Sequence, residues 1–135
     1  MRRLVLLILM VAALVSGGVA CRRGLSGSSA PAVVVVEVGP TQGGPPVVGT
    51  PVPVTVIVQR NDGSPVEGAK VSLEATMTHA GMKPVFADAT EVAPGKYKAA
   101  VEFTMGGDWI IIVRVTLPDG QTFEHTAQVR GVRAK

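Results

Sequence analysis

Apolar and polar residues alternate along several short segments, and this pattern constrains the fold more than any other feature of the sequence. From Val71 to Met77 every second residue is apolar and the residues between are polar, a period typical of a strand with one buried face. The same period recurs over 54–58, 97–105 and 123–129, and more weakly over 85–92, while 32–38 and 109–115 are largely apolar throughout. No segment after residue 20 has a sustained helical period.

Turn signals separate these segments at regular intervals. They are 61–65 (NDGSP), 94–95 (PG), 106–107 (GG) and 118–120 (PDG). Residues 40–53 are rich in glycine and proline, which predicts a loop or an edge segment that cannot pair fully. We therefore predict an all-β fold over residues 31–133, an immunoglobulin-like β-sandwich of about seven antiparallel strands, with Trp109 as a core aromatic.

The first twenty residues have the composition of a secretory leader. Arg2 and Arg3 precede an unbroken apolar run from Leu4 to Val15, and small residues follow at 16–20. A positive start, a short apolar run and a small-residue cleavage site predict a signal peptide over 1–20. The alternative is an anchor that is never cleaved, but the run is short against the roughly 20 apolar residues that span a bilayer.

Cys21 is the only cysteine, so an intramolecular disulfide is excluded. The segment Gly18-Val19-Ala20-Cys21 resembles the bacterial lipoprotein signal. That resemblance implies cleavage before Cys21, a diacylglyceryl group on its sulfur, and anchoring to the extracytoplasmic side of a membrane in the cell envelope. Residues 21–30 are dominated by glycine and serine and are expected to form a flexible tether.

Charge and motif content exclude two broad classes of function. Without Arg2 and Arg3 the chain has 11 basic and 10 acidic residues, a net charge of +1, and no basic block, so we expect no nucleic-acid partner. It contains two histidines, and it lacks G-x-S-x-G, H-E-x-x-H and a phosphate-binding glycine loop. We therefore predict that the protein is not an enzyme.

One segment, residues 77–84 (MTHAGMKP), carries residues that suit metal binding. Met77, His79 and Met82 lie within six residues, and Met105 and His125 could join them only through the fold. Thioether and imidazole ligands suit soft or borderline metals, above all Cu(I). Thioethers need not lose a proton to bind, so they stay available in an acidic or oxidising envelope.

A second interpretation of the same residues requires no metal. Met77 and Met105 continue the apolar phase of their strands, and methionine is a common core filler. His79 and Met82 fall in a loop. Residues in loops can be metal ligands or merely exposed to solvent, and both interpretations remain open for these two. His125 is in phase with apolar neighbours, as a half-buried histidine would be.

The stretch from Met77 to Val115 resembles the YtkA-like domain, which is similar to the periplasmic part of FixH. The resemblance rests on a Met/His loop ending in Pro84, then Gly95-x-Tyr97, then Phe103-x-Met105-x-Gly107-x-Trp109. It implies a small β-sandwich outside the cytoplasmic membrane and a role in copper supply or oxidase assembly. The expected function is therefore a lipid-anchored module that binds Cu(I). The alternative is a structural or protein-interaction module of the envelope that meets a protein partner without metal.

Overall fold

The computed structural model describes residues 32–39, 44–79 and 81–135, and within them the chain forms seven strands and no helix. The predicted signal peptide, Cys21 and the tether lie outside the described residues. The strands are β1 (Val33–Val38), β2 (Pro51–Gln59), β3 (Lys70–Thr76), β4 (Val85–Ala93), β5 (Lys96–Glu102), β6 (Gly107–Thr116) and β7 (Thr122–Val132). Nowhere in this described part does a helix have the length and apolarity needed to cross a membrane.

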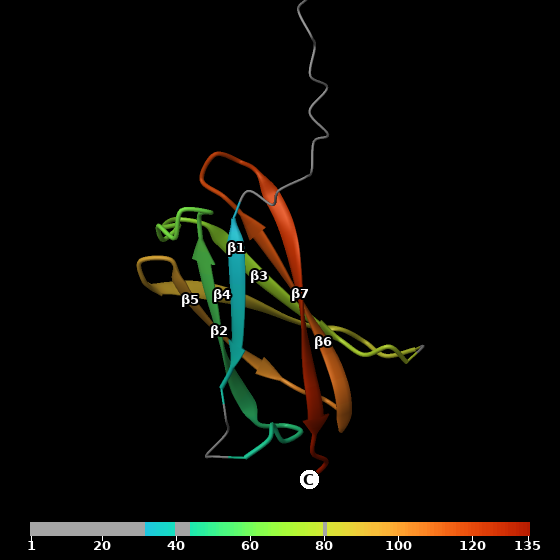
Figure 1. Cartoon of the computed structure of the whole chain (residues 1–135). Helices are drawn as coiled ribbons and strands as arrows, with labels where there is room; N and C mark the ends of the chain where they lie inside the picture. Colours follow the sequence, from blue (N-terminus) through green and yellow to red (C-terminus); the bar gives the residue numbers. More distant parts are fainter. Residues whose placement is uncertain (1–31, 40–43, 80) are drawn as a thin grey trace, which may run out of the picture.

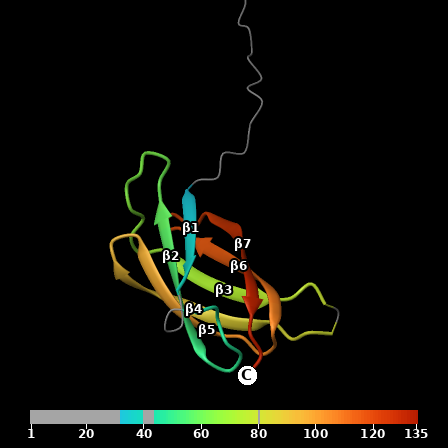
Figure 2. The ribbon, with the colours of Figure 1, turned by 60° about the horizontal axis from the view of Figure 1, so that its bottom comes forward.

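All neighbouring strands are antiparallel, in the order β1-β2-β5-β4-β3-β6-β7 (Figure 1). Cut between β4 and β3, this order gives a four-strand and a three-strand half that match the two sheets of a constant-type immunoglobulin domain. The predicted all-β, immunoglobulin-like class of seven antiparallel strands is therefore confirmed. The turned view in Figure 2 shows the sheet curling around its interior.

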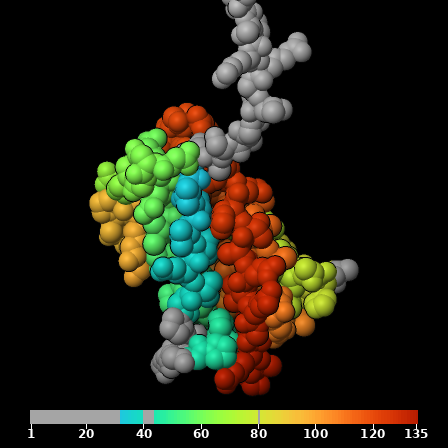
Figure 3. All heavy atoms as spheres, viewed as in Figure 1, coloured from blue at the N-terminus to red at the C-terminus, as the bar shows by residue number. Residues whose placement is uncertain are grey.

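Strand β4 belongs to both halves of the fold. Its first part, from Val85 to Ala89, pairs with β3, and its second part, from Thr90 onward, pairs with β5. At the opposite side β1 and β7 lie side by side on the surface (Figure 3). The molecule is thus one continuous sheet folded over on itself, with β4 at the corner.

The core lies between the two halves and is built by the alternating residues that the sequence pattern indicates. Every second residue of β2, from Val52 to Val58, is fully buried, and in β6 the same holds from Trp109 to Val115. Trp109, Tyr97 and Phe103 are the largest fully buried side chains. Among the described residues no polar or charged side chain other than the tyrosine hydroxyl enters this core.

Strand β2 begins earlier than its first regular alternation at Val54. Pro51 and Pro53 pair with Glu102 and Ala100 of β5, while β1 reaches only as far as Val38, opposite Val54. Pro51 therefore lies where β2 has a strand on one side only, whereas on the β1 side of Pro53 its carbonyl oxygen accepts a hydrogen bond from the Gly39 N–H at 2.8 Å. A residue without an N–H is tolerated at such a margin of the sheet. Of the two forms predicted for 40–53, the edge segment is correct for 51–53.

Candidate functional site

The β3–β4 loop and the β5–β6 turn lie at the same end of the sandwich. Antiparallel pairing places the end of β3, at Thr76, opposite Ile110 near the start of β6, and β5 ends at Glu102 just before the turn. We call this the methionine end, because Met77, Met82 and Met105 all belong to these two connections. They are the only methionines after residue 20, although up to 28 positions separate them in the sequence.

Met77, at the start of the β3–β4 loop, contacts the β5–β6 turn. Its side chain is buried, 7% exposed, and continues the inward phase of β3. Its Cε lies 3.0 Å from the position that a Cβ on Gly107 would occupy, so the methyl group rests directly against the first residue of β6. Met77 is therefore a core residue, as the interpretation without metal predicts. The Met77 thioether also lies beside the turn that carries Met105.

Met105 departs from the phase of its strand. Strand β5 ends at Glu102, Phe103 is buried, and the Met105 side chain is 48% exposed. The expectation that Met105 packs in the core as a continuation of Phe103 is therefore wrong, since the chain has already turned.

The backbone of that turn is nevertheless fixed. Trp109 Nε1 donates a hydrogen bond to the Met105 carbonyl oxygen at 2.9 Å. The Trp109 ring meets the Phe103 ring edge-on, with centroids 5.2 Å apart and an interplanar angle of 61°. A buried aromatic pair thereby holds the turn in place while the thioether of Met105 stays accessible to solvent.

The other residues of the predicted metal set differ in their surroundings. Met82 is half-buried and packs against the core, and His79 is exposed in the loop. His125 is half-buried on β7 opposite Val113, four residues along β6 from Trp109. Four residues of strand correspond to about 13 Å, so His125 stands apart from the methionine end.

The chemistry of the methionine end is that of neutral sulfur. Within the three described ranges, no three His, Cys, Asp or Glu side chains come together as a group able to hold a metal ion. Thioethers fall outside that ligand set and favour Cu(I) over harder cations. The arrangement thus provides one exposed thioether, one half-buried and one buried, with a single imidazole in the same loop.

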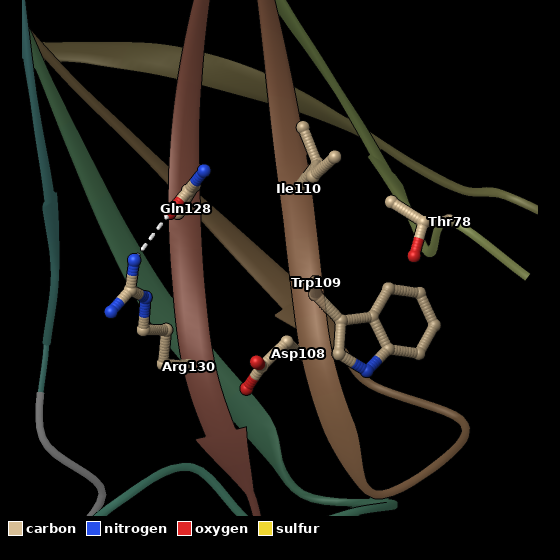
Figure 4. Close-up of a pocket in the computed structure, with 6 residues that line it drawn as sticks. All are labelled: Thr78, Asp108, Trp109, Ile110, Gln128 and Arg130. Carbon is tan, nitrogen blue, oxygen red and sulfur yellow. Dashed lines mark hydrogen bonds between the residues drawn. The ribbon is translucent and has the colours of Figure 1, made fainter.

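A pocket of about 330 Å³ lies beside this end, over the outer face of β6 and β7, and the sequence analysis missed it. Figure 4 shows Asp108, Arg130 and Gln128 gathered on that face, with Thr78 of the β3–β4 loop beside Trp109. Ile110 completes the lining. The residues come from three segments of the chain, and only the register of β6 against β7 brings the charged ones together. The nearest signal in the sequence is a glycine next to each charged residue, at 107 and 131.

A family model, described as YtkA-like, matches residues 36–114. The chain belongs to the YtkA-like family. The matched range contains the whole of β2 to β5, most of β6 and both connections of the methionine end, so the resemblance expected from residues 77–115 is confirmed. Strand β7, with His125 and Arg130, lies beyond it.

Among curated proteins, none matches this YtkA-like chain. Two solved structures are similar in shape. The ZirS C-terminal domain is 18% identical with a TM-score of 0.45, covering 76% of this chain, which in turn spans 65% of that one. A cohesin module from the family 33 glycoside hydrolase of Clostridium perfringens ATCC13124 is 14% identical with a TM-score of 0.39, covering 77% of this chain and 98% of its own.

Proposed function

We propose that this YtkA-like protein is an extracytoplasmic, lipid-anchored binding module without catalytic activity, and that its ligand is Cu(I) held at the methionine end. One observation carries the proposal: all three methionines after residue 20 belong to two adjacent connections, with the Met77 methyl group against Gly107 of the turn that carries Met105. Neutral thioethers grouped in this way suit Cu(I). In this proposal copper is a cargo that the module receives and passes on.

The proposed copper ligands differ in their accessibility to solvent, which suggests an order in which they bind an incoming Cu(I) ion. Met105 is exposed and His79 lies in the exposed part of the loop, so these two meet an incoming ion first. Met82 and Met77 are less accessible to an incoming ion, because both side chains pack against the core. His125 is not included, since four residues of strand separate it from the turn.

A competition titration tests the copper proposal. The full chain in detergent micelles is titrated anaerobically with Cu(I) against a chelator of known affinity, as wild type and as Met77→Leu/Met82→Leu/Met105→Leu. Leucine removes the thioethers at nearly constant volume, so the core stays filled. We expect one Cu(I) per wild-type chain, quenching of Trp109 fluorescence, and loss of both signals in the triple variant.

His125→Gln is the matched control, and it is expected to bind like wild type. Thermal unfolding of each variant separates loss of ligands from loss of fold. Binding that survives the triple leucine substitution, or no binding by a folded wild-type chain, would overturn the copper proposal.

The anchoring part of the proposal is tested separately. Protein extracted from membranes is expected to begin at Cys21 and to carry the mass of a diacylglyceryl group, as mass spectrometry measures directly. An intact first segment with an unmodified Cys21 thiol would contradict lipid anchoring and leave the copper proposal standing.

A protein-interaction module without metal is the second candidate, and one observation favours it. Phe86 on β4 is 67% exposed, opposite Glu74 of β3 on the outer face of the sheet. Aromatic side chains are enriched in protein interfaces relative to the rest of the surface, so Phe86 is the position at which a partner contact is sought first. Phe86→Ser is therefore expected to change the free energy of unfolding by no more than about 0.5 kcal/mol. A photo-crosslinking residue placed on β4 should form crosslinks to the partner in intact cells, and Phe86→Ser should abolish them. Crosslinks that persist in the variant would exclude the surface around Phe86 as the contact site.

A further inference from the structure

The pairing of β6 with β7 breaks at one point beside the methionine end. Trp109 pairs with Val129 and Gly107 with Val132, so Arg130 and Gly131 together oppose Asp108. Gly131 adopts a φ of +68°, which suits the extra residue of a β-bulge. Bulges of this kind re-aim side chains, and here Asp108 and Arg130 end on the same outer face (Figure 4).

Each of these two charged side chains is held by a neighbour other than its opposite charge. The Asp108 Oδ1 accepts a hydrogen bond from the Gly131 N–H at 2.9 Å, and the Arg130 Nη2 donates to the Gln128 Oε1 at 3.1 Å. In the described part of the chain neither residue forms an ion pair. One carboxylate oxygen and most of the five guanidinium N–H donors therefore remain available to a ligand.

Arg114, further along the same face of β6, shows the contrast. Its guanidinium lies 2.7 Å from a Glu124 carboxylate oxygen and 3.0 Å from one of Glu74. The hydrogen bond with Glu124, followed by the attraction of both carboxylates, raises the pKa of Arg114 above its usual value. Arg114 on this face is therefore paired with opposite charges, whereas Asp108 and Arg130 at the pocket are not.

The pocket gives these two charges a shared space. Its volume of about 330 Å³ is at the lower end of the range for small-molecule sites. Thr78 adds a hydroxyl group, Gln128 an amide and Ile110 an aliphatic surface. A carboxylate and a guanidinium on neighbouring strands, roughly 5 Å apart at the backbone, fit a ligand that carries both charges close together.

We propose that this pocket binds a small zwitterion, an amino acid or a dipeptide, with the ligand's ammonium group on Asp108 and its carboxylate on Arg130. The site shares none of its residues with the proposed copper ligands, although Thr78, which lies between Met77 and His79, is part of its lining. It needs no metal, so it does not depend on the proposed copper function.

The test is a titration of the isotope-labelled full chain in detergent micelles with glycylglycine, followed by the backbone amide resonances of Gly131 and Thr78. N-acetylglycylglycine, which lacks the ammonium group, and glycylglycinamide, which lacks the carboxylate, are titrated in parallel. We expect saturable shifts with glycylglycine, and at least about tenfold weaker binding of either analogue, since each loses a charge-assisted hydrogen bond.

Asp108→Asn removes one charge at nearly constant size, and Arg130→Gln removes the other together with part of the side-chain length; each is expected to weaken glycylglycine binding by about tenfold or more. Arg114→Gln on the same strand face is the matched control and should bind like wild type. Equal binding of all three peptides, unchanged binding in the Asp108 and Arg130 variants, or no saturable shift in the folded wild type would each overturn the proposal. Because Cu(I) binding is expected to survive both pocket substitutions, the two proposals can fail separately.

Discussion

At the residue scale, Gly107 carries two constraints at once. Its φ of +122° lies in a region that side chains rarely adopt, and a Cβ there would meet the Met77 Cε at 3.0 Å. The first constraint concerns its own backbone, and the second concerns how close the loop methionine can come to the turn. A glycine at this position therefore fixes both the start of β6 and the location of the buried thioether.

Gly107→Ala is predicted to lower the free energy of unfolding by about 1–3 kcal/mol through backbone strain, and to displace the Met77 methyl group. Urea unfolding measures the first effect, and the Met77 methyl resonance measures the second.

Gly120→Ala is the control for this prediction, because Gly120 has a φ of +89° and no atom within 4 Å of the added Cβ. It should lose stability through the backbone and leave the Met77 methyl resonance unchanged. If the methyl resonance is equally unmoved in Gly107→Ala, the contact does not position Met77.

At the scale of elements, Tyr97 of β5 fastens the β2–β3 connection to the sheet. Its hydroxyl donates to the Val66 carbonyl oxygen at 2.7 Å and accepts the Ala69 N–H at 3.0 Å, while its ring is buried at 1% exposure. Burial, with a contribution from the nearby Glu91 carboxylate, raises the pKa of Tyr97 from 10.0 to about 12. The neutral phenol is therefore the form that the fold prefers.

This preference gives the stability a defined dependence on pH. Because the pKa of Tyr97 is higher in the folded state, its contribution is complete below pH 10 and is lost as pH rises from 10 to about 12. Tyr97→Phe is predicted to cost about 1–3 kcal/mol at pH 7, since two backbone groups lose their partner. Urea unfolding from pH 7 to 12 should show the difference between wild type and variant shrinking above pH 10, and a constant difference would contradict the assignment.

The strands could be predicted from the sequence because a period of two is a local property. Every second residue from Val71 to Met77 and from Tyr97 to Val101 faces inward, as the spacing of the apolar residues indicates. The end of β5 could not be located in this way, since the alternation of apolar residues runs on to Met105 after the chain has left the strand. An apolar residue in a turn has the same sequence signature as one in the core.

The pocket was missed for a different physical reason. Asp108 and Arg130 are 22 positions apart and meet only because β6 and β7 pair in one register with a bulge at Gly131. Register over that distance is set by the packing of the whole sandwich and not by local sequence. The methionines were found from composition alone, since their chemistry is visible wherever they lie.

At the scale of the whole molecule, the methionine end and the start of β1 lie at opposite ends of the sandwich. β1 begins at Val33, opposite Gln59, whereas the β3–β4 loop and the β5–β6 turn lie where β1 finishes. The 11 residues of β7 run the length of the domain, about 36 Å. If Cys21 is anchored as proposed, the methionines face away from the lipid surface.

This geometry predicts an orientation that fluorescence can measure. If residues 21–30 form the flexible tether expected from their sequence, its root-mean-square length is about 17 Å, so the two ends of the domain differ in their mean distance from the bilayer. Quenchers carried by lipids are expected to affect Trp109, near the methionine end, only weakly. A tryptophan moved to the β2–β3 loop, as Asn61→Trp with Trp109→Phe, should be quenched more strongly. Equal quenching at both positions would contradict this difference in mean distance from the bilayer.

The corner strand β4 has a mechanical consequence. Because its first half bonds to β3 and its second half to β5, the two halves of the sandwich are connected through hydrogen-bonded backbone as well as through apolar contact. A load that pulls the C-terminal strand against a membrane anchor at the other end must therefore break a ladder of hydrogen bonds before the halves can slide apart. We therefore expect such a sandwich to withstand shear better than two sheets joined only by their side chains.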